Sequence, residues 1–170
     1  MAAIQLADHQ IQAIRKMHNG CILNGSVGSG KSRTALAYYY ILQGGRIDGG
    51  EKYARMQNPI DLYIITTAKK RDDFEWESEM APFLLSTHQD CNSYQNHVIV
   101  DSWNNISKYT NAQNSFFIFD EQRVVGSGAW AKSFLKIVKS NQWILLSATP
   151  GDTWQDYVPV FIANGFFKNK

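Results

Sequence analysis

Short apolar runs alternate with longer segments along the whole chain. The runs are rich in β-branched and aromatic residues and are short enough to be buried strands. They cover residues 21–23, 62–66, 97–100, 116–119 and 143–146. The longer segments that we predict to be helices cover residues 6–17, 33–41, 72–82, 129–139 and 153–164. Strands that alternate with helices predict an α/β fold, a three-layer sandwich with a mainly parallel central sheet.

Two of the predicted helices carry recognisable ends. Asp8 suits the N-cap of the first helix, and Gly20 follows the position where that helix should stop. The segment 72–82 begins with acidic residues, whose charges suit the positive end of a helix dipole. Phe74 and Trp76 in that segment are expected to pack in the core rather than to act in a site.

The bulk composition bounds the class of protein. A chain of 170 residues with 44% hydrophobic and 19% charged residues fits one globular domain, residues 1–170. Lys and Arg (17) against Asp and Glu (15) give +2, which by itself does not indicate nucleic acid. Cys21 and Cys91 are isolated and suggest a reducing compartment. No run is long enough for a membrane span and no secretion signal is visible, so we expect a cytoplasmic protein.

The strongest motif of the chain is a glycine-rich loop between the first strand and the second helix. The segment Gly25–Ser32 reads G-x-x-x-x-G-K-S, the Walker A pattern, whose backbone N–H groups cradle phosphates at a helix N-terminus. Lys31 would reach the β- and γ-phosphates, and the Ser32 hydroxyl would bind Mg²⁺. The alternative, a chance Ser/Gly turn, is disfavoured by this strand–loop–helix context. The predicted nucleotide-binding residues are Gly25, Ser26, Val27, Gly28, Ser29, Gly30, Lys31, Ser32 and Arg33.

A second motif follows the run 116–119, which ends in Asp120 and Glu121. An uninterrupted apolar run is typical of a central parallel strand, and the carboxyl ends of such strands face the active site. Beside a Walker A loop, Asp120 would bind Mg²⁺ together with Ser32, and Glu121 would orient or deprotonate the attacking water. Without that loop, a strand that simply ends in acidic residues would be the better interpretation.

Two further polar stretches have both a functional and a structural interpretation. Gln10 lies in the first helix, and its amide could pair with the edge of adenine, although an isolated glutamine is usually a surface residue. The segment Thr67–Arg71 combines hydroxyl and basic side chains, which suit either contacts to a phosphate backbone or a solvated strand end.

Taken in order, these motifs resemble the first RecA-like lobe of superfamily-two helicases, over essentially the whole chain. The spacing of Trp76 and Glu79 and the Ser-Ala-Thr-Pro sequence at 147–150 resemble the Swi/Snf-like and phage-encoded DEAD/DEAH-type branch, which acts on DNA. The family usually has Ala-His or Ala-Asp after its Asp-Glu, where this chain has Gln-Arg at 122–123. The resemblance implies an adenine-binding Gln10, nucleic-acid contacts from Thr67, Lys69, Lys70 and Ser102, and coupling by Ser147 and Thr149.

The resemblance also implies cofactors and partners. It implies an ATP hydrolase that uses ATP or ADP with Mg²⁺ and grips the DNA backbone without sequence specificity, with no membrane partner. Because these enzymes need a second RecA-like lobe with arginine fingers, which is absent from this chain, we expect the isolated lobe to bind nucleotide but to turn over poorly. Two alternatives stay open, a viral DNA-packaging ATPase and a non-catalytic, nucleotide-gated module that binds DNA or a partner.

Overall fold

A parallel sheet organises the chain in the computed structural model, which describes residues 6–24, 30–47, 54–120 and 128–147. Within these residues the sheet has five strands in the order β1-β5-β4-β2-β3, and every pairing is parallel. The strands are β1 (Ile22–Asn24), β2 (Leu62–Thr66), β3 (Val98–Ser102), β4 (Phe116–Asp120) and β5 (Gln142–Ser147). The predicted α/β architecture is confirmed.

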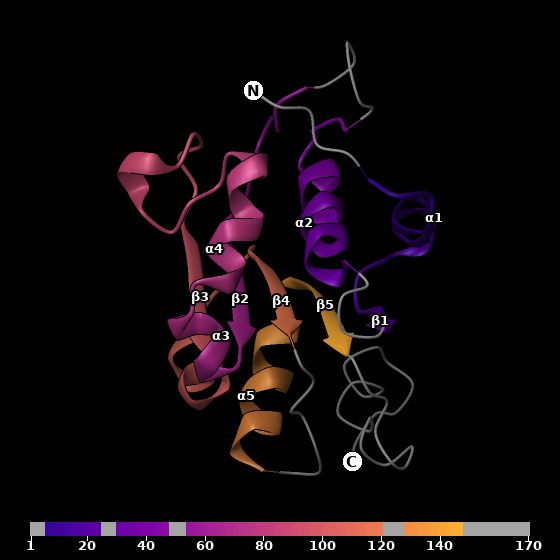
Figure 1. The fold of residues 1–170 in the computed structure, drawn as a ribbon. Coiled ribbons are helices and arrows are strands. Elements are labelled where there is room, and N and C mark those ends of the chain that lie inside the picture. Colours follow the sequence, from indigo (N-terminus) through magenta and orange to yellow (C-terminus); the bar gives the residue numbers. More distant parts are fainter. Residues whose placement is uncertain (1–5, 25–29, 48–53, 121–127, 148–170) are drawn as a thin grey trace.

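Helices cover both faces of this sheet (Figure 1). One face carries α2 (Lys31–Leu42), α4 (Glu75–Met80) and the short helix η1 (Ala81–Phe83), with α1 (Asp8–Lys16) packed against α2. The other face carries α5 (Ala129–Val138) and η3 (Trp103–Tyr109). The described part is completed by α3 (Ala68–Asp72), which follows β2, and by η2 (Gln89–Cys91). None of the described helices is long and apolar enough to cross a membrane.

The central strand β4 shows why the sheet needs two covering layers. All five of its residues are buried. Because side chains alternate along a strand, Phe116 and Ile118 enter one hydrophobic cluster, and Phe117 and Phe119 enter the other. The uninterrupted apolar run in the sequence therefore corresponds to a strand that is covered on both sides.

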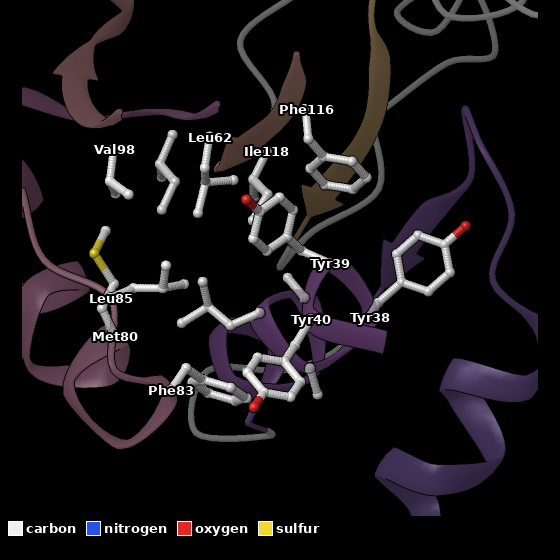
Figure 2. Close-up of a cluster of buried hydrophobic side chains, with 14 of the residues drawn as sticks. Tyr38, Tyr39, Tyr40, Leu62, Met80, Phe83, Leu85, Val98, Phe116 and Ile118 are labelled. Atoms are coloured by element: carbon white, nitrogen blue, oxygen red, sulfur yellow. The ribbon is translucent and has the colours of Figure 1, made fainter. Parts of the chain in front are cut away.

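The helix α2 packs against one face of the sheet and is the most deeply buried helix on that face. Every residue from Thr34 to Tyr40 is buried, so this helix is enclosed by its neighbours rather than resting on one face. Figure 2 shows Tyr39 lying against Phe116 of β4, with ring centroids 5.4 Å apart. The Tyr40 hydroxyl donates to the carbonyl of Ala54 at 2.8 Å. Buried tyrosines with satisfied hydroxyls fix α2, and with it the end of the Walker A motif, on the sheet.

Three local predictions are wrong. Phe74, which the sequence predicts to pack in the core, has an exposed side chain. Asp8 is not the N-cap of α1 but its first helical residue, and Ala7 occupies the N-cap position. The predicted helix 72–82 is also not one helix, because α3 ends at Asp72 and α4 begins at Glu75. The chain breaks at Phe74, which has a φ of 57°, in the left-handed region that bulky residues rarely adopt. The predicted last helix, 153–164, lies outside the described residues.

Candidate nucleotide and metal site

The register of the sheet brings Asp120 and the end of β1 to one edge. Asp120 of β4 lies level with Leu146 of β5, and Leu146 lies level with Leu23 of β1. Adjacent strands are about 4.8 Å apart, so Asp120 and Leu23 are separated by roughly 10 Å across β5. One residue after Leu23, β1 ends and the Walker A segment begins. Asp120 and the end of β1, the strand that precedes the glycine-rich segment in the sequence, therefore lie at the same edge of the sheet.

The strand between them, β5, ends in Ser147, the residue predicted to couple the nucleotide site to DNA. Ser147 is buried and pairs in register with Asn24, the last residue of β1. It therefore stands between the strand that leads into the Walker A segment and the strand that carries Asp120. A movement of either β1 or β4 would therefore reach Ser147 directly through the sheet.

The start of α2 requires a glycine. Gly30 is the N-cap of α2 and has a φ of 81°, a conformation that only glycine adopts readily. A Cβ at this position would also lie 2.6 Å from the Nε2 atom of Gln10, so the Gln10 side chain would have to move away from Gly30. Lys31 and Ser32 follow in the first turn and are half-buried. The exposed Arg33 lies 3.9 Å from the Glu79 carboxylate.

Gln10 uses both ends of its amide inside the protein. Its Oε1 accepts the backbone N–H of Ala7 at 2.8 Å, and its Nε2 donates to the carbonyl of Gly30 at 3.1 Å. The same carbonyl accepts from the backbone N–H and the hydroxyl of Thr34, at 3.0 and 2.9 Å. Gln10 thus ties α1 to the end of the Walker A motif. Contact with adenine stays a prediction.

Asp120 is only 2% exposed, and its carboxylate is held by donors from three different elements, β2, α3 and α4. Its Oδ2 accepts from the Thr66 hydroxyl at 2.8 Å, from the Trp76 indole N–H at 2.9 Å and from the Lys70 ammonium at 3.3 Å. Its backbone carbonyl accepts the indole N–H of Trp103 at 2.9 Å. The sequence predicts that Trp76 packs in the core, but it does not predict this hydrogen bond to Asp120. The available signal was that a buried indole N–H needs an acceptor.

A second buried carboxylate, Asp101, lies near the end of β3. Its Oδ1 accepts from Arg71 Nη1 at 3.0 Å, from Asn105 Nδ2 at 2.8 Å and from the Ser102 backbone N–H at 2.7 Å. The Tyr109 hydroxyl donates to its Oδ2. Burial raises the pKa of Asp101, but the hydrogen bonds outweigh it and leave the pKa below its ordinary value.

The four residues predicted to contact nucleic acid have different surroundings. Thr67 is the N-cap of α3, and its hydroxyl accepts the backbone N–H of Lys70. Ser102 is buried and accepts from Arg71 Nη1 at 3.3 Å. Lys69 is well exposed and pairs with Asp73 at 2.9 Å, whereas Lys70 turns toward Asp120. Of the four side chains, that of Lys69 is therefore the most accessible to a DNA strand.

Several predicted site residues lie outside the described part of the chain. They are Gly25, Ser26, Val27, Gly28, Ser29, Glu121 and Thr149. Their roles stay predictions.

The described donors fit Mg²⁺ bound with a nucleotide rather than a metal held by protein alone. Ser32 and Asp120 offer hydroxyl and carboxylate oxygens, the hard ligands that Mg²⁺ prefers. Among the described residues, no group of three or more His, Cys, Asp or Glu side chains could hold a metal ion. Mg²⁺ in phosphate-binding sites typically has one or two protein ligands, with waters and phosphates supplying the others.

No protein-family model matches the chain, and no curated protein matches it in sequence. Among solved structures, it is similar to the SWI2/SNF2 ATPase core of Sulfolobus solfataricus in complex with dsDNA, with a TM-score of 0.66 and 15% identity over 95% of this chain and 36% of that chain. It is also similar to the Hef helicase domain of Pyrococcus furiosus, with a TM-score of 0.61 and 16% identity over 95% of this chain and 36% of that chain. The large terminase ATPase domain of Thermus phage P74-26 aligns less well, with a TM-score of 0.49 and 14% identity over 88% of this chain and 67% of that chain.

The first two likenesses define the class of fold. Together with the parallel sheet they confirm the predicted α/β fold of the RecA-like P-loop NTPases. The chain spans only 36% of the length of each of these two structures. At these identities the likeness establishes the fold alone, and the terminase likeness is too weak to bear on function.

Proposed function

We propose that this chain is the ATP-binding lobe of a DNA-dependent ATPase of the helicase or translocase kind, which couples hydrolysis of Mg·ATP to movement on DNA. The observation that carries the proposal is the register that sets Asp120, Ser147 and the end of β1 side by side at the carboxyl edge. Open parallel sheets bind their ligands at this edge. In the sequence, the Walker A pattern directly follows β1 and ends in Lys31 and Ser32, the first two residues of α2.

Each residue of the site has a distinct role under this proposal. The backbone N–H groups at the start of α2 and the Lys31 ammonium bind the phosphates. Ser32 and Asp120 hold the metal, and Glu121 orients the attacking water or takes its proton. Bound Mg²⁺ would supply the positive charge that offsets the negative charge developing on the transferred phosphoryl group. Gln10 keeps Gly30 in its left-handed conformation and so preserves the shape of the loop end.

The partners follow from the same proposal. DNA would be gripped by its backbone, because motors that step along a strand need contacts that do not depend on sequence. The similar SWI2/SNF2 core was solved with dsDNA, which supports DNA as the partner. A second RecA-like lobe would supply the arginine finger, which is worth several orders of magnitude in rate. We therefore propose weak turnover by this chain alone.

The test combines nucleotide binding with phosphate release. Binding of a fluorescent ADP analogue is measured with and without Mg²⁺ for the wild type and for Lys31→Ala. The matched control is Lys139→Ala, which removes an exposed lysine at the opposite edge of the sheet, just before β5. We expect Lys31→Ala to lose at least about tenfold in affinity, since a charge-assisted phosphate contact is removed, and Lys139→Ala to bind as the wild type does.

Phosphate release is then measured without DNA, with single strands and with duplex, using Glu121→Gln as the blank. Slow release that Glu121→Gln abolishes supports a catalytic lobe. Release that Glu121→Gln leaves unchanged, together with DNA binding that depends on nucleotide, favours the non-catalytic binding module. Fast release stimulated by DNA would contradict the need for a second lobe, and absence of Mg-dependent nucleotide binding would overturn the whole proposal.

A further inference from the structure

Two neighbouring cations of α3 reach two different strand ends. The Lys70 ammonium lies 3.3 Å from Asp120 Oδ2 at the end of β4, and Arg71 Nη1 lies 3.0 Å from Asp101 Oδ1 near the end of β3. The strand β2, from which α3 emerges, lies between β3 and β4 in the sheet. A short helix thereby connects a segment predicted to contact DNA with the carboxylate predicted to hold the metal.

The three donors on Asp120 Oδ2 are not equivalent. The side chains of Thr66 and Trp76 are 0% and 1% exposed and are fixed in the core. The Lys70 side chain is 30% exposed, makes the longest of the three contacts and carries a full positive charge on a flexible stem. Of these three donors, Lys70 can therefore leave the carboxylate most easily, and it is the one that carries a positive charge.

We propose that Lys70 is the counter-cation of Asp120 in the nucleotide-free protein and that Mg·nucleotide displaces it, releasing its ammonium toward a DNA phosphate. The inference rests on the proposed function, because it concerns the same carboxylate. A buried carboxylate needs a neighbouring cation, and Lys70 and Mg²⁺ compete for that place. DNA and Mg·nucleotide would then favour each other, since a phosphate that binds the Lys70 ammonium leaves Asp120 available to the metal.

The remainder of α3 is built to stay in place during this exchange. Arg71 is anchored on Asp101, which has further donors from Ser102, Asn105 and Tyr109. The backbone N–H of Lys70 is bound by the Thr67 hydroxyl at the N-terminus of the helix. The Lys70 side chain can therefore turn without unwinding α3. DNA sensing and metal binding would be coupled by one side chain rather than by movement of a domain.

The experiment titrates Mg²⁺ into the chain at a fixed concentration of fluorescent ADP analogue and records the Mg²⁺ concentration at half-saturation. Lys70→Met keeps the length of the side chain and removes its charge, and Lys70→Gln serves as a second variant if the first is poorly folded. The control is Lys139→Met, on an exposed lysine that lies outside the proposed site. We expect the half-saturating Mg²⁺ concentration to fall about fivefold in both Lys70 variants and to stay unchanged in Lys139→Met.

A second arm measures the affinity for a fluorescent single-stranded oligonucleotide with and without Mg·ADP. The wild type should bind DNA more tightly in the presence of Mg·ADP, and the Lys70 variants should lose that difference. An unchanged or raised Mg²⁺ requirement in Lys70→Met and Lys70→Gln overturns this inference and leaves the proposed function intact. A wild type that shows no Mg-dependent nucleotide binding overturns both.

Discussion

Asp101 and Asp120 are two buried aspartates near the carboxyl edge of one sheet, separated by the strand β2, and each is paired with a cation of α3. Asp101 receives donors on both oxygens, including a backbone N–H. The three side-chain donors described for Asp120 all meet Oδ2. Among the described donors, those of Asp101 meet both carboxylate oxygens, whereas the side-chain donors of Asp120 meet one.

The two sets of donors also differ in where they come from in the sequence, which fits a structural role for Asp101 and the proposed metal-binding role for Asp120. The donors of Asp101 come mainly from the next few residues, Ser102, Asn105 and Tyr109, so they form together with η3. The donors of Asp120 come from β2, α3 and α4. The hydrogen bonds of Asp120 would therefore change if β2, α3 or α4 moved. The hydrogen bonds of Asp101 connect neighbouring residues and stabilise the local fold. We expect substitutions at the two positions to affect different measurements.

The largest effect on stability should come from Asp101→Ala. This change leaves the buried donors of Ser102, Asn105 and Tyr109 without their acceptor, and we expect it to lower the free energy of unfolding by about 3 kcal/mol. The measurement is urea denaturation followed by tryptophan fluorescence. Asp101→Asn keeps an acceptor oxygen and should lose less. A wild-type midpoint for Asp101→Ala would show that this network does not stabilise the fold.

Two tryptophans offer a smaller and sharper test. Trp76 donates to the Asp120 carboxylate and Trp103 to the Asp120 backbone carbonyl, each at 2.9 Å, and both side chains are buried. Trp76→Phe and Trp103→Phe should each cost about 1–2 kcal/mol of stability, since each removes one buried hydrogen bond. Only Trp76→Phe should raise the Mg²⁺ concentration needed for nucleotide binding, because only it loosens the carboxylate.

Trp103→Phe is the control for that experiment, because it matches the loss of packing and of one bond on the same residue. Equal Mg²⁺ requirements in the two variants would mean that Trp76 has a structural role alone. A raised requirement in both would mean that the strand, rather than the carboxylate, had moved.

Much of the fold could be predicted because its signals are local. The apolar run before Asp120 marks a strand covered on both faces, and the glycine-rich pattern after residue 24 requires a turn and a helix start. The parallel direction of the strands also follows, since strands joined through helices run in one direction. These features depend on short stretches of sequence, so the placement of Asp120 at the carboxyl edge followed as well.

The parts that could not be predicted depend on partners far away in the sequence. Phe74 gives no local indication of a left-handed residue, so the break between α3 and α4 was missed. Lys70 is one of three adjacent basic residues, and only the packing of α3 turns it toward Asp120, 50 positions later. The bond of Gln10 to Gly30 spans 20 positions. Contacts of this kind become visible only when the tertiary structure places the two groups together.

The smallest expected effect is a pH dependence that belongs to Asp101. Its hydrogen bonds hold the pKa of the folded carboxyl below the value of about 3.9 that an unfolded aspartate has. The unfolded state then binds more protons between the two values, so the stabilisation is complete above about pH 4 and is lost as the pH falls through the folded pKa.

The difference in unfolding free energy between the wild type and Asp101→Asn should therefore shrink on acidification. Urea midpoints from neutral pH down to about pH 2.5 measure it, and Tyr109→Phe, which removes one of the bonds responsible, should fall between the two. A difference that stays constant across this range would mean that the Asp101 carboxyl has the same pKa in the folded and unfolded states. Its negative charge would then not contribute to stability.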